Sequence, residues 1–224
     1  MGRYVRALSP TAEFAIVIVG AFGLFIFASF EQAFSPRPWV DLSDAQIRSV
    51  LVYESVILVA LSMFLHVRGW TPQRIGLEPH PRDFPAGLAL AVAVHVAFLA
   101  AWLLTSSIFL QLTQPISSST SVGPTLSLVN VMTVSVVNPL FEEMFVCGYV
   151  VSALRERRSL WTAINVSAAI RLLYHLYQGA LGVLTIVPTG LIFAYWYART
   201  GRLWPAILAH ALLNFIALAI SAGG

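Results

Sequence analysis

Apolar residues run along this chain in seven long stretches, separated by short polar connectors. A helix needs about 20 mostly apolar residues to cross the hydrocarbon of a bilayer. The pattern therefore predicts an all-α protein, a single polytopic membrane helix bundle of about seven transmembrane helices. The expected spans are 12–33, 47–67, 84–107, 125–154, 159–177, 180–198 and 202–221.

The composition supports a membrane protein. Of the 224 residues, 58% are hydrophobic and only 10% are charged, whereas about a quarter of a soluble domain is charged. No basic face interleaved with aromatic residues indicates nucleic-acid binding. Cys147 is the single cysteine, which excludes an intrachain disulfide and a metal site built from several cysteines.

All 13 basic residues are arginines, and ten of them gather in alternate connectors. Arg37 and Arg48, near Asp41 and Asp44, are the exceptions at the other connectors. Positive residues remain on the cytoplasmic side of a membrane, so we expect the N-terminus inside and the C-terminus outside. We expect an integral protein of the bacterial inner (plasma) membrane. The arginines of the predicted cytoplasmic side are Arg3, Arg6, Arg68, Arg74, Arg82, Arg155, Arg157, Arg158, Arg199 and Arg202.

Several polar residues fall inside the predicted spans, where an ionisable group indicates function unless shown otherwise. We interpret Glu54 as a residue that bonds to a neighbouring helix, and His95, alone on its helix, as a packing residue. In the fourth span, Asn138 and Pro139 predict a kink or break, because proline interrupts helical hydrogen bonding.

The remaining polar residues form pairs at i,i+4 spacing on three different spans. Residues four apart share a helix face, so each of three helices presents a polar pair. Interhelical hydrogen bonds are worth well under about 2 kcal/mol each, which makes a purely structural role a weaker explanation than a site. The pairs are Glu143 with Cys147, Arg171 with His175, and His210 with Asn214.

This set of side chains suits the hydrolysis of a peptide bond. A carboxylate in a low-dielectric site can serve as a general base for water, and a histidine can orient that water or carry its proton. A histidine and an asparagine can donate hydrogen bonds to an oxyanion. The chain lacks the H-E-x-x-H and G-x-S-x-G motifs. Two histidines and a glutamate could also bind zinc, which the sequence leaves open.

Three motifs occur in order on successive spans: "EEMFVC" (142–147), "RLLYH" (171–175) and "HALLN" (210–214). Over about residues 125–217 the chain resembles the CPBP family. This family comprises the type II CAAX prenyl endopeptidases and the bacteriocin-processing and bacteriocin-immunity proteins of the Abi family. The resemblance divides the single transmembrane domain into an N-terminal three-helix part, 1–124, and a catalytic core, 125–221.

The resemblance implies a glutamate-dependent intramembrane endopeptidase. Glu142 would activate water, His175 would position or deprotonate it, and His210 with Asn214 would form the oxyanion site. Glu143 would give structural or electrostatic support. No cofactor is required, and a zinc ion, if present, would use Glu142, His175 and His210. The expected substrate is a peptide or membrane-protein segment, with or without lipid modification.

Two positions depart from the family motifs. The family has arginine where this chain has Cys147, and phenylalanine where it has Arg171. We hypothesise an exchange in which Arg171 reaches from the fifth span to pair with Glu143, and the small Cys147 leaves room for it.

Two other functions remain open. The chain could be a catalytically inactive family member that acts as a membrane immunity or scaffold protein. It could also be a small proton-coupled transporter, although no interrupted helices in matching halves support that reading.

Overall fold

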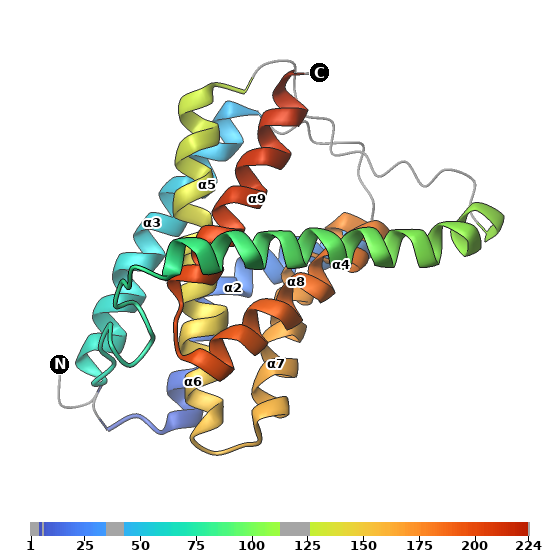
Figure 1. Cartoon of the computed structure of the whole chain (residues 1–224). Helices are drawn as coiled ribbons and strands as arrows, with labels where there is room; N and C mark the ends of the chain where they lie inside the picture. Colours follow the sequence, from blue (N-terminus) through green and yellow to red (C-terminus); the bar gives the residue numbers. More distant parts are fainter. Residues whose placement is uncertain (1–4, 6, 35–42, 113–125, 224) are drawn as a thin grey trace.

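The computed structural model describes residues 5, 7–34, 43–112 and 126–223, and within these it leaves the side chains of 105–112, 180–181 and 221–223 undescribed (Figure 1). These residues form helices and no strands. The order is α2 (Pro10–Phe34), α3 (Asp44–Val67), α4 (Asp83–Leu112), α5 (Leu128–Glu142), η1 (Glu143–Tyr149), α6 (Val150–Arg155), α7 (Leu160–Tyr174), η2 (Leu176–Gln178), α8 (Gly179–Thr200) and α9 (Trp204–Gly223).

Because α5, η1 and α6 follow one another without a gap, the described chain has seven helical segments, one for each predicted span. Four are long and apolar enough to cross a membrane: Pro10–Phe34, Asp44–Val67, Asp83–Leu104 and Leu128–Arg155. Large apolar side chains such as Phe27, Val59 and Leu103 are exposed on them, as expected of surfaces that face lipid. The predicted all-α membrane bundle is confirmed.

Serine side chains start three of the helices. Ser43, Ser127 and Ser159 are N-caps of α3, α5 and α7, and each hydroxyl accepts a hydrogen bond from a backbone N–H in the first turn. Such caps satisfy donors that have no partner within the helix. The helix starts are thus fixed by local sequence.

Helices α3, α5 and α9 run side by side, and α4 lies across α9 and also packs against α8 (Figure 1). Gly87 of α4 permits a close crossing with α9. A Cβ atom at this glycine would lie 2.9 Å from Cβ of Leu208 and 3.2 Å from the carbonyl oxygen of Pro205. The absence of a side chain therefore lets the two helix backbones approach.

The irregularity in the fourth segment lies after the predicted position. Helix α5 continues through Pro139 to Glu142 without a break. The next seven residues, η1, are π-helical, and all of them are buried. Since π-helical turns are rare and occur often at functional sites, this change of winding, which falls between Glu142 and Glu143, marks the acidic pair.

Candidate functional site

The two adjacent acids lie where α5 becomes η1. Glu142 is the last residue of α5 and Glu143 the first of η1. Glu142 is 6% exposed and Glu143 is fully buried. Two carboxylates in the interior of an apolar bundle require a counter-charge or hydrogen-bond donors.

Arg171 of α7 provides the counter-charge. Its Nη2 donates to both oxygens of Glu143 at 2.6 and 2.7 Å, and its Nη1 donates to Oε2 of Glu142 at 3.1 Å. The predicted pair with Glu143 is present, and the bond to Glu142 is an addition that the sequence did not indicate. Cys147 is fully buried in η1. One guanidinium thus joins both acids to the next helix.

His210 of α9 bonds to the same carboxylate. Its Nδ1 lies 2.7 Å from Oε1 of Glu143. Because an ionised carboxylate only accepts hydrogen bonds, Nδ1 carries the proton and Nε2 is the ring nitrogen left for other partners. Glu143 therefore holds His210 as well as Arg171.

Asn138, one turn before Glu142, connects three helices. Its Nδ2 donates to Oε1 of Glu54 at 2.7 Å and to Oε1 of Glu142 at 3.0 Å. Its Oδ1 accepts from Nδ2 of Asn214 at 3.0 Å. From the sequence alone, Asn138 had no expected role beyond the kink, although its i,i+4 spacing to Glu142 was a usable signal.

Tyr174 is a second residue that the sequence analysis missed. Its hydroxyl donates to Oε2 of Glu142 at 2.7 Å, and the side chain is buried. An aromatic residue in an apolar helix gives no sequence signal of such a contact, because packing alone would explain it.

His175 is the C-cap of α7, where the helix ends before η2. Its Nδ1 lies 2.9 Å from the carbonyl oxygen of Arg171. A carbonyl only accepts, so Nδ1 carries the proton of the neutral ring and Nε2 has a free electron pair. This arrangement leaves Nε2 able to take a proton.

A cavity of about 690 Å³ brings the four proposed catalytic residues together. Phe22, Phe25 and Ser29 of α2 contribute to its wall, together with Glu54 of α3, so the N-terminal helices help to build the site. His95 is exposed on α4 and lies elsewhere. Of the site residues predicted from the sequence, four line this cavity: Glu142, His175, His210 and Asn214. Glu143, Arg171 and Cys147 do not line it.

The carboxylates and one histidine are close enough to hold a metal ion. Ligand atoms of Glu142, Glu143 and His210 lie within 4.8 Å of one another, in a set that omits His175. This differs from the set expected from the sequence, in which His175 took the place of Glu143. Arg171 already donates to both carboxylates, so a cation entering here would compete with the guanidinium.

The part of the chain that carries this site is similar to known membrane peptidases. The family model described as type II CAAX prenyl endopeptidase Rce1-like matches residues 124–216. The match includes all three motifs and confirms the resemblance to the CPBP family.

One similar protein is the Bacillus subtilis (strain 168) protein named "Putative membrane peptidase YdiL". It is 32% identical over 80 residues, which cover 36% of this chain and 32% of the relative. The chain thus matches about a third of that protein's length. No solved structure matches this chain.

Proposed function

We propose that this protein is an intramembrane endopeptidase in which a water molecule activated by Glu142 hydrolyses a peptide bond. The observation that carries the proposal is the convergence of Glu142, His175, His210 and Asn214 on one cavity. The match to an endopeptidase family supports the reaction class. A cavity of about 690 Å³ is within the size range of sites that bind small ligands or short segments.

Glu142 has room for a water molecule. It accepts hydrogen bonds from Asn138, Arg171 and Tyr174. An ionised carboxylate offers about four acceptor positions, so about one is left for water. These donors fix the carboxylate in the position from which it can orient the nucleophile.

His175 is suited to share the proton of that water. Its Nε2 has a free electron pair because Nδ1 is engaged by the Arg171 carbonyl. As the water oxygen bonds to the substrate carbonyl carbon, its proton passes to Glu142 or to His175. The same proton can then be given to the leaving amine.

His210 and Asn214 are suited to bind the oxyanion. In protonated form His210 donates through both nitrogens, so Nδ1 stays on Glu143 while Nε2 donates to the oxyanion. Asn214 uses one amide hydrogen on Asn138 and retains a second for the oxyanion. Preorganised donors of this kind often contribute the largest part of catalysis.

We also propose that the reaction needs no zinc, because Arg171 already pairs with both carboxylates that would bind it. Metal analysis of the purified protein and activity after chelation test this point. Loss of activity on chelation, restored by zinc, would contradict it.

The central test is peptide cleavage by the purified full chain in liposomes, with internally quenched peptides that carry or lack a C-terminal prenylated cysteine. We expect Glu142→Gln to lower kcat at least about 100-fold, the lower end of general acid–base contributions. Glu78→Gln is the matched control, because Glu78 is an exposed glutamate outside the cavity. Equal cleavage by both variants would remove Glu142 from the mechanism.

A second candidate is a non-catalytic immunity or scaffold protein. The direct bond between Arg171 and Glu142 favours it, since a cation on the proposed base makes that base weaker. Peptides that bind the wild type and the Glu142→Gln variant equally, and are never cleaved, would establish this alternative.

A further inference from the structure

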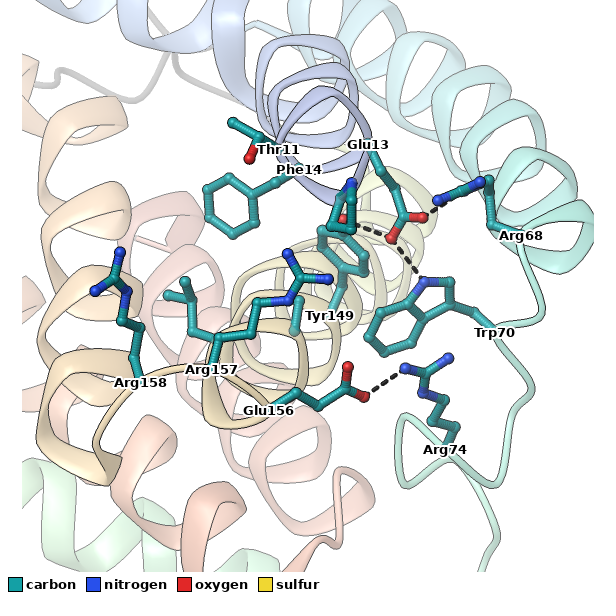
Figure 2. A pocket seen from close by; sticks show the side chains of 13 residues that line it. Thr11, Glu13, Phe14, Arg68, Trp70, Arg74, Tyr149, Glu156, Arg157 and Arg158 are labelled. Carbon is teal, nitrogen blue, oxygen red and sulfur yellow. Dashed lines mark hydrogen bonds and ion pairs between the residues drawn. The ribbon is translucent and has the colours of Figure 1, made fainter. Parts of the chain in front are cut away.

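A second cavity, of about 490 Å³, lies at one end of the bundle (Figure 2). It is formed where α2 begins, where the connector after α3 begins, and where α6 turns into α7. None of its lining residues also lines the cavity of the proposed active site. It therefore needs an explanation of its own.

Two of the four arginines in this cavity are neutralised. Arg68 pairs with Glu13, whose other oxygen accepts from Trp70 Nε1 at 2.8 Å and from the Tyr149 hydroxyl at 3.1 Å. Arg74 pairs with Glu156. The charges of these two pairs cancel, so they leave no net charge for a ligand.

Arg157 and Arg158 make the cavity positive. Both are exposed, and neither side chain forms an ion pair with a carboxylate among the residues that the structure describes. Figure 2 shows the two side chains extending from the α6–α7 turn toward the α2 end, where Thr11 and Phe14 lie. The two guanidiniums lie apart in Figure 2, and each can donate forked, charge-assisted hydrogen bonds to a phosphate group.

Aromatic rings lie behind the wall beside these arginines, and those of Trp70 and Tyr149 are almost fully buried. The rings of Trp70 and Tyr149 are 4.9 Å apart, those of Phe14 and Tyr149 are 6.1 Å apart, and the guanidinium of Arg74 lies 3.8 Å from the centre of the Trp70 ring. Tryptophan and tyrosine gather at the level of the lipid headgroups. The cavity therefore offers cations for a phosphate, and the partly buried side chains of Phe14 and Leu154 offer an apolar surface for what is attached to it.

We propose that this cavity binds the phosphate of an anionic phospholipid headgroup through Arg157 and Arg158. Its location at the ends of membrane-spanning helices places it at headgroup level, on the side that carries most of the arginines. Basic pockets between membrane helices bind such headgroups in other proteins. An inorganic phosphate has the same charged group but would leave the apolar surface of Phe14 and Leu154 uncovered.

The test is native mass spectrometry of the detergent-solubilised full chain titrated with phosphatidylglycerol, with phosphatidylcholine and with inorganic phosphate. We expect phosphatidylglycerol to bind in preference to the other two. Arg157→Gln with Arg158→Gln should weaken its binding at least about tenfold, the size of one hydrogen bond to a charged group. Arg157→Lys with Arg158→Lys should retain more binding than the glutamine pair.

The matched control is Arg82→Gln with Arg199→Gln, which removes two exposed arginines outside the cavity and changes the net charge equally. Equal losses in the two double variants would overturn the proposal, because they would indicate general charge attraction. If inorganic phosphate binds as tightly as phosphatidylglycerol, with the same dependence on Arg157 and Arg158, the cavity is a phosphate site. The proposal that its ligand is a lipid would then be refuted. Circular dichroism confirms that the variants remain folded.

Discussion

Arg171 is almost fully buried, with 1% of its surface exposed, and its side chain bonds to two carboxylates from another helix. A buried ion pair gains little over apolar packing, but removing one partner is costly because it leaves an uncompensated charge. Removing Arg171 should therefore destabilise the site by more than the ion pairs contribute to folding.

The exchange between positions 147 and 171 can be tested at this scale. Arg171→Phe should lower the free energy of unfolding by about 3–5 kcal/mol and abolish cleavage, because Glu142 and Glu143 lose their cation. Adding Cys147→Arg to that variant should recover stability and activity. Thermal unfolding in detergent measures the stability, and peptide cleavage measures the activity. If Arg171→Ala changes neither stability nor activity, the exchange hypothesis is wrong.

Asn138 permits a second test, because it bonds to Glu54, Glu142 and Asn214 at once. Asn138→Ala should lower the free energy of unfolding by about 1–3 kcal/mol, because the carboxylates of Glu54 and Glu142 each lose a donor. It should also lower kcat by a larger factor than it changes KM. Thr133→Ala, at an exposed position on the same helix, is the control for thermal unfolding and kinetics. An equal effect of both substitutions would show that Asn138 has no special role.

At the scale of the helices, the pattern of apolar residues was enough to predict where each helix lies in the sequence. It did not predict how the helices are wound. The predicted spans 47–67 and 202–221 correspond closely to Asp44–Val67 and Trp204–Gly223. The π-helical η1 was not foreseen, because its residues are as apolar as those of an α-helix. The crossing of α4 over α9 depends on contacts between distant residues, which one sequence does not display.

The same limit applies to the candidate site. Spacing on a helix identified which faces carry Glu143, Arg171 and His210, since that relation is local. The contact of Tyr174 with Glu142 depends on how two helices rotate against each other. Such a rotation is set by packing along the entire interface and leaves no local pattern.

Packing of α7 against α8 can be tested at Gly190. A Cβ atom there would lie 3.3 Å from Cδ of Arg171 and 3.3 Å from Cα of Ala168, so Gly190→Ala should push the helices apart and displace the guanidinium. We expect about 1–3 kcal/mol of destabilisation from overpacking, measured by thermal unfolding, together with lower activity. Gly20→Ala is the control, because its Cβ would lie 3.4 Å from the nearest atom, in Leu61. A Gly190→Ala variant as stable as the control would contradict this account.

At the scale of the whole molecule, the N- and C-terminal ends of the described chain lie at opposite ends of the bundle (Figure 1). The proposed lipid cavity, with Arg157 and Arg158, lies where α2 begins and α6 ends. The predicted orientation puts that end in the cytoplasm.

Reporter fusions test the orientation. Alkaline phosphatase is active outside the cytoplasm and green fluorescent protein fluoresces inside it, so we expect phosphatase activity from a C-terminal fusion and fluorescence from a fusion within residues 156–159. The reverse result would show that the chain inserts with the opposite orientation, and the lipid cavity would then face the other leaflet.

The bond between Arg171 and the two glutamates also has a consequence for biosynthesis. Ribosomes make α5 before α7, so the acids reach the membrane before the arginine that pairs with them, and a charge alone in the bilayer costs at least a few kcal/mol. The fourth span should therefore remain beside the insertion machinery until the fifth arrives. A nascent chain that stops after Arg158 should be extracted by alkaline carbonate more readily than one that stops after Gln178, and Glu142→Gln with Glu143→Gln should remove that difference.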